Sequence, residues 1–149
     1  MAIIDLHSRH VLSWKVSNRL DNELCLEALE IVLSGGHKPE IFHFDQGSQF
    51  TSGDFVARLQ AERIKISWSG RKCYYDNILL ERLWRTLKHE EVFLHAHSDG
   101  WEAEICPARF LWRYCHVRQH SALGGRTPHA AYIEAEPYSS RPELTISGA

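Results

Sequence analysis

The sequence of 149 residues has no apolar run that approaches the length of a membrane-spanning helix. Residues 1–20 also lack the long apolar segment of a secretory signal peptide. Its four cysteines form no C-x-x-C pair, so reduced thiols in a cytoplasmic protein are the expectation. We expect three of them to be small buried residues, namely Cys25, Cys106 and Cys115.

Neither sign of charge dominates, because the formal net charge is −2 and provides no global field that would attract nucleic acid. Residues 105–129 nevertheless contain no Asp or Glu, and their arginines are interleaved with aromatic and histidine side chains. This pattern fits a surface that contacts phosphates and stacks on bases, or the cationic outer face of an amphipathic helix. Composition alone favours the helix face. The residues are Arg109, Arg113, Arg118 and Arg126, with Trp112, Tyr114, His116 and His120.

The sequence does contain a regular succession of strand and helix patterns, and its length and 44% apolar content fit one domain with a core. The patterns predict the order β-β-α-β-α-β-α-α, in which the first two strands form a hairpin. This order is typical of an α/β sheet flanked by helices. The expected strands cover 2–5, 10–16, 40–44 and 64–68, and the expected helices cover the segment from Asp21 to Gly35, 53–62, 77–93 and 99–118.

Two features of the C-terminal third interrupt these patterns. Pro107 is expected to kink the last helix or to divide it into two pieces. The segment from Ser121 is rich in proline, glycine and serine and is expected to be irregular. We therefore expect a folded core over residues 1–135 and an irregular tail over residues 136–149.

Asp45 is the first candidate site residue, and it lies in the stretch FHFDQGSQFTS. It follows the strand expected over 40–44, and ligands of α/β sheets bind at such carboxyl ends of strands. The D-x-G pattern is also common turn chemistry. Taken alone, Asp45 is therefore better explained as a turn residue than as a ligand.

Glu81 is the second candidate, in the helix expected over 77–93. One stripe of this helix holds three leucines that should face the core, and another stripe is polar. The periodicity leaves two interpretations open: a solvated Glu–Arg pair worth a few tenths of a kcal/mol, or a carboxylate facing a cleft beside two cations placed for phosphates. The core stripe is Leu80, Leu83 and Leu87, and the polar stripe is Asn77, Glu81, Arg85 and Lys88.

A strand-end Asp and a helix Glu together suit a hard divalent cation such as Mg²⁺, which binds oxygen ligands and is often shared with substrate phosphates. Two such ions, about 3.5–4 Å apart, can activate a nucleophilic oxygen and stabilise a leaving oxygen in phosphoryl transfer. Two ions normally need more than two carboxylates, so a third acid is expected.

Four segments of the chain, in this order, resemble the DDE integrase-core superfamily, and most closely the transposases of bacterial insertion sequences of the IS-three group. Thirty-five residues lie between Asp45 and Glu81, which is the spacing between the second and third acids of that superfamily. Four motifs in order are far more specific than any single one. The segments are IIDLHSRHVLSWKVS, FHFDQGSQFTS, CYYDNILLERLWRTLKHE and RQHSALGGRTPHAAY, and they cover roughly residues 2–135.

The resemblance implies an RNase H-like mixed sheet flanked by helices, and Mg²⁺- or Mn²⁺-dependent cleavage and strand transfer of DNA. It assigns catalytic metal binding to Asp45 and Glu81. It also implies transposon ends and target DNA as partners, a homo-oligomer, and a place in the bacterial cytoplasm in association with the nucleoid. The DNA-binding candidates are Arg85 and Lys88, on the stripe of Glu81, and Arg113 and Arg118, in the cationic segment.

The sequence departs from the family pattern at its beginning. The first acid of the family lies on a strand before the IIDLHSR segment, and Asp5 matches a different Asp, so we expect an N-terminally truncated core without the first acid. That strand is central in the family fold, and its loss is expected to leave unpaired backbone groups in the sheet. A catalytic transposase core therefore competes with a truncated, inactive remnant that acts only as a DNA-binding or interaction module.

Overall fold

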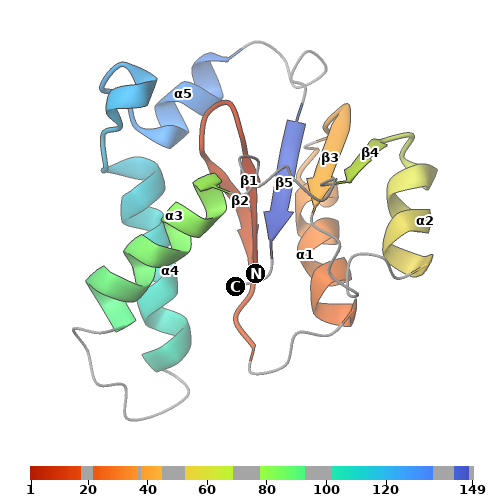
Figure 1. Ribbon diagram of the computed structural model, residues 1–149, viewed down its shortest axis with the longest axis horizontal. Coiled ribbons are helices and arrows are strands. Elements are labelled where there is room, and N and C mark those ends of the chain that lie inside the picture. Colours follow the sequence, from red (N-terminus) through yellow and green to blue (C-terminus); the bar gives the residue numbers. More distant parts are fainter. Residues whose placement is uncertain are drawn as a thin grey trace.

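The computed structural model describes residues 1–17, 22–36, 38–44, 53–68, 78–92, 102–135 and 143–147. A five-stranded sheet lies at its centre, with helices on both faces (Figure 1). The α/β architecture predicted from the sequence is therefore confirmed.

The four strands predicted from the sequence are all present. β1 (Ala2–Asp5) and β2 (Val11–Trp14) pair antiparallel and form the expected hairpin. β3 (Ile41–Phe44) and β4 (Lys65–Trp68) pair in parallel. The hairpin and the parallel pair form the two sides of the sheet.

A fifth strand, β5 (Glu143–Ser147), joins these two sides, and the strand order is β2-β1-β5-β3-β4. It pairs antiparallel with β1 and parallel with β3, so that Ile146 is opposite Ile3 on one side and Phe44 on the other. Two predictions are therefore wrong. The tail over residues 136–149 is not irregular throughout, and the gap expected between the hairpin and β3 is filled.

The position of β5 has a physical reason. Without it, the facing edges of β1 and β3 would present unpaired N–H and C=O groups in the middle of the sheet, which is costly. The sequence Leu144-Thr145-Ile146 alternates apolar and polar residues, as a short strand does. The proline, glycine and serine on either side of it concealed this signal.

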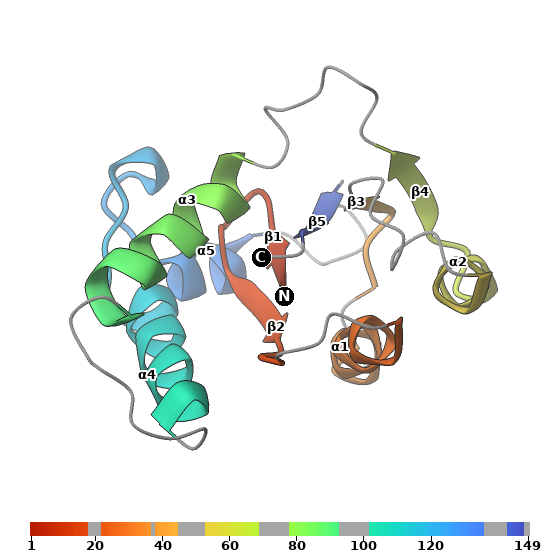
Figure 2. The same ribbon diagram turned by 60° about the horizontal axis from the view of Figure 1, so that its bottom comes forward.

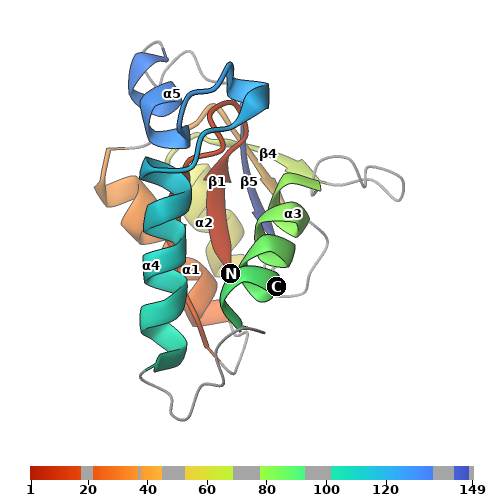
Figure 3. The same cartoon turned by 90° about the vertical axis from the view of Figure 1, so that its left-hand side faces the viewer.

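The helices cover the two faces of the sheet in pairs. α1 (Asn22–Ser34) and α2 (Gly53–Ala61) share one hydrophobic core with Ile3, whereas α3 (Ile78–Leu87) and α4 (Glu102–His116) share a second core with Ala2 and Ile4. Neighbouring side chains of β1 thus point to opposite faces, as the pleat requires. Figures 2 and 3 show the two pairs of helices on opposite sides of the strands.

The segment after α3 differs from the prediction in detail. α3 continues into a π-helical segment, η1 (Lys88–Val92), and α4 runs through Pro107 as one helix instead of dividing there. A 3₁₀ turn, η2 (Ser121–Leu123), and a further helix, α5 (Pro128–Glu134), occupy a region predicted to be irregular.

The start of α5 carries two ordinary helix signals. The Thr127 hydroxyl accepts a hydrogen bond from the Ala130 N–H at 3.2 Å, and Pro128 begins the helix. The glycines just before Thr127 are typical of a loop, and for this reason the sequence did not predict the helix. In the part of the chain that the structure describes, none of the helices combines the length and the apolar composition needed to cross a membrane.

Candidate metal and DNA-binding site

Asp45 lies outside the described residues, but the strand that precedes it, β3, lies within them. β3 ends at Phe44, which is fully buried, so Asp45 directly follows the carboxyl end of β3. The ring of Phe44 packs edge-on against the ring of Phe55 in α2, with 5.6 Å between the centroids. This bulky residue therefore anchors the end of the strand to the core.

Glu81 lies in the first turn of α3, and its side chain is exposed. The three leucines predicted to face the core are buried, which confirms the orientation of the helix. The Glu81 carboxylate forms no ion pair or hydrogen bond with any described residue, and Arg85 does not pair with it. The structure therefore does not contain the solvated Glu81–Arg85 pair that the periodicity left open.

The fold brings the helix of Glu81 near the strand that precedes Asp45. α3 contacts β5, and β5 is hydrogen-bonded to β3. α3 therefore contacts the strand that lies between the hairpin and β3. Among the described residues, which exclude Asp45, no group of three or more His, Cys, Asp or Glu side chains is arranged to hold a metal ion.

Two of the predicted DNA-binding residues lie on the same helical segment as Glu81. Arg85 is exposed one turn beyond Glu81. Lys88 is exposed as the first residue of η1, where the helix widens. Within the described ranges neither cation pairs with a carboxylate.

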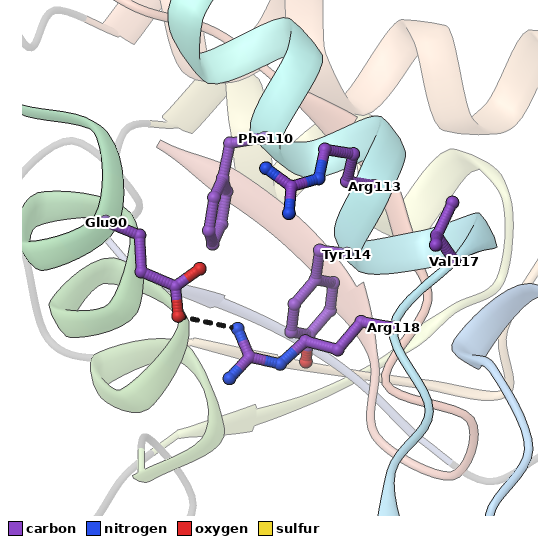
Figure 4. Close-up of a pocket in the computed structure, with 6 residues that line it drawn as sticks. All are labelled: Glu90, Phe110, Arg113, Tyr114, Val117 and Arg118. Carbon is purple, nitrogen blue, oxygen red and sulfur yellow. Dashed lines mark hydrogen bonds and ion pairs between the residues drawn. The ribbon is translucent and has the colours of Figure 1, made fainter.

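The other two predicted residues, Arg113 and Arg118, line a cavity of about 250 Å³ between α4 and η1 (Figure 4). Arg118 donates a hydrogen bond to the Glu90 carboxylate at 2.9 Å, and both side chains are exposed. Tyr114 forms part of the wall, and its burial raises its pKa to about 12. Because Tyr114 is buried, it cannot belong to the base-stacking surface that was one interpretation of residues 105–129. Trp112, in contrast, is 59% exposed.

Sequence reasoning missed two arginines. Arg9 and Arg82 line a second cavity together with Arg118. Arg82 lies beside Glu81 in the sequence but off its stripe, and Arg9 lies in the turn between β1 and β2. The available signal for Arg9 was its positive charge close to the IIDLH segment. Helical periodicity could not reveal it, because Arg9 lies in a turn.

Asp5, the only acid in the first motif, has a structural role. It is buried, and its Oδ2 accepts hydrogen bonds from the Ser8 N–H at 3.0 Å and from the Ser8 hydroxyl at 2.5 Å. These bonds close the turn between β1 and β2. That Asp5 is not the first acid of a catalytic triad stays a prediction.

Comparison with known proteins yields one consistent result. Two family models, both described as integrase core domain, match residues 1–72 and 62–128. The chain is 31% identical over 133 residues to the transposase InsF for insertion sequence IS3A of Escherichia coli, and 31% identical over 131 residues to the transposase for insertion sequence element IS904 of Lactococcus lactis. These alignments cover 85% and 84% of this chain, but 45% and 51% of the relatives.

The fold has solved counterparts. The magnesium complex of the HTLV-2 integrase catalytic core domain, in its dimeric form, superposes with a TM-score of 0.66 and 20% sequence identity, covering 85% of this chain and 79% of that one. This likeness establishes the RNase H-like fold. The chain spans about half the length of the curated relatives it matches.

Proposed function

Because this chain belongs to the integrase core domain family, we propose that it forms the catalytic core of a DDE-type transposase, which cleaves DNA strands and transfers them with the help of divalent metal ions. One structural observation supports this proposal above the others. The Glu81 carboxylate is exposed and forms no ion pair or hydrogen bond with any described residue. Its helix contacts β5, and β5 pairs with β3, whose end precedes Asp45.

Asp45 and Glu81 are the residues proposed to hold Mg²⁺ or Mn²⁺. Carboxylate oxygens are the ligands these hard cations prefer, and no described side chain competes for Glu81. When bound, such ions activate a nucleophilic oxygen and neutralise charge on the leaving oxygen. The buried leucine stripe of α3 fixes the direction in which Glu81 points.

The cations around this site are proposed to bind the DNA backbone. Arg85 and Lys88 follow Glu81 along the exposed side of the same helical segment, and Arg113 and Arg118 are exposed on α4 and at its end. A net charge of −2 provides no general attraction for DNA, so binding depends on local clusters of this kind.

Assembly and location belong to the same proposal. One solved relative is described as a dimeric form, and we propose that this chain also acts as a homo-oligomer on transposon ends and target DNA. We propose the bacterial cytoplasm, in association with the nucleoid, as its location.

The metal proposal can be tested without an activity assay, by calorimetric titration of Mn²⁺ into the wild type and into Asp45→Asn and Glu81→Gln. Each substitution is expected to weaken binding about tenfold or more, since even residues that only support a metal ligand contribute that much. Glu40→Gln is the matched control, because Glu40 is exposed and forms no ion pair with described residues. Equal Mn²⁺ affinity in all four proteins would refute the assignment, and DNA binding that persists without metal binding would favour the interaction module.

A further inference from the structure

The second cavity has a volume of about 250 Å³ and lies between α3, the β1–β2 turn and the segment that follows α4. Its described wall carries guanidinium groups from Arg9, Arg82 and Arg118, and no carboxylate. Arg118 is held by Glu90 on the side of the first cavity (Figure 4), whereas Arg9 and Arg82 form no ion pair with any described residue. Positive charge is therefore concentrated in a concave site.

Arg9 is held there by an unusual backbone. Its φ angle is +62°, in the left-handed region that non-glycine residues rarely adopt. Its N–H donates to the Asp5 carbonyl at 2.7 Å, and the bonds between Ser8 and the Asp5 carboxylate hold the same turn. Backbone strain of this kind concentrates at binding sites, where the surrounding structure enforces it.

His120 adds a polar atom that has no partner among the described residues. Its Nε2 is buried in the wall of this cavity and forms no hydrogen bond with any of them. Its ring lies edge-on to the Tyr114 ring, with 4.9 Å between centroids. Burial lowers the pKa of His120, and the charges of Arg9 and Arg118 lower it further. An anion between these groups would give the imidazole a partner and offset both positive charges.

We propose that this cavity binds a phosphate group, with Arg9, Arg82 and the His120 imidazole as its ligands. Guanidinium forks match the geometry of phosphate oxygens, and an exchange of Glu90 for phosphate adds Arg118 as a further ligand. That the phosphate belongs to DNA rests on the proposed function. It is either a diester of the backbone or a monoester at a strand end, and the chemistry of recognition is the same.

The first experiment uses inorganic phosphate in metal-free buffer and follows the ring signals of His120 by NMR at constant ionic strength. In the wild type these signals are expected to shift saturably, with a rise of the His120 pKa as phosphate binds. Arg82→Gln and Arg9→Gln are each expected to weaken binding about tenfold, the typical contribution of a hydrogen bond between charged groups. Arg63→Gln is the control, because Arg63 is an exposed arginine with φ of +59°, in the turn between α2 and β4.

The second experiment measures the affinity of the same proteins for two duplexes of one sequence, with and without 5′-phosphates, over a range of salt concentrations. If the cavity holds a backbone phosphate, Arg82→Gln lowers the salt slope by about 1 for both duplexes. If it holds a terminal phosphate, only the 5′-phosphorylated duplex is affected. Either result supports the cavity as a phosphate site.

The inference is overturned if Arg82→Gln and Arg9→Gln respond to inorganic phosphate like Arg63→Gln. Because the two variants lie on separate elements, misfolding of one leaves the other as a test. Failure of the proposed function has a different signature, since Glu81→Gln is expected to leave phosphate binding intact. A protein that binds phosphate but not Mn²⁺ would refute the metal site and retain this one.

Discussion

Removal of β5 is expected to unfold the protein, because this strand connects the two sides of the sheet. Four residues of β5 are paired with β1, and four with β3. Truncation after residue 142 therefore removes about eight backbone hydrogen bonds, each with a net contribution of about 1 kcal/mol. The resulting loss of about 8 kcal/mol is comparable to the whole stability of a domain, which is roughly 5–15 kcal/mol.

The assay is urea unfolding followed by circular dichroism, comparing residues 1–149 with residues 1–142. Residues 1–147 are the control, since this variant keeps β5 entire. A synthetic peptide of residues 141–149, added to the truncated protein, is expected to restore the transition, whereas a scrambled peptide is not. If the truncated protein unfolds at the same urea concentration and with the same slope as the full chain, β5 does not complete the sheet.

Four other predictions follow from named residues. A protein of residues 1–149 is expected to show little Mn²⁺-dependent strand transfer on a matched transposon end, because only two of the three family acids are assigned. Robust activity that both Asp45→Asn and Glu81→Gln abolish would contradict this prediction, and Asp5 would then be the first candidate for the third acid. Lys88→Ala is expected to weaken DNA binding across sequences and to reduce its salt slope, and an unchanged slope would mean that Lys88 is an ordinary solvated residue. Burial and the neighbouring His116 lower the pKa of His129 below its unfolded value. The contribution of neutral His129 to stability is therefore present above about pH 6.5 and is lost as the pH falls. His129→Gln should reduce the difference in stability between urea melts at pH 7 and pH 5. Arg9→Gly should leave the free energy of unfolding unchanged or raise it by up to about 1 kcal/mol, because glycine tolerates a φ of +62°, and it should weaken phosphate binding. A clear loss of stability would show that Arg9 supports the fold.

Periodicity predicted those elements whose apolar residues lie on one face. The leucine stripe of α3 is buried as expected, and in α2 Phe55 and Leu59 are buried as well. It is less informative for α1, where Ile31 is 47% exposed and Leu29 is buried. Apolar residues surround most of α1, so no single face could be chosen from the sequence.

The candidate site was predicted in part, for a related reason. Glu81 and the exposure of its neighbours followed from helical spacing, and the family spacing connected Glu81 to Asp45. The cavity of Arg9, Arg82 and Arg118 combines a hairpin turn, the middle of one helix and the end of another. No local pattern relates residues so far apart in the chain, and a residue's capacity to hold a strained φ angle is set by its surroundings.

The position of β5 makes the two sites interdependent. Arg9 belongs to the hairpin, and Asp45 follows β3, and in the strand order these two parts of the sheet meet through β5. A register shift of β5 would move the hairpin relative to β3, and would also disturb α3, which contacts β5 and carries Glu81 and Arg82. Substitutions of Glu81 and Arg82 should therefore impair metal and phosphate binding separately, whereas a change in β5 that leaves the protein folded should impair both together.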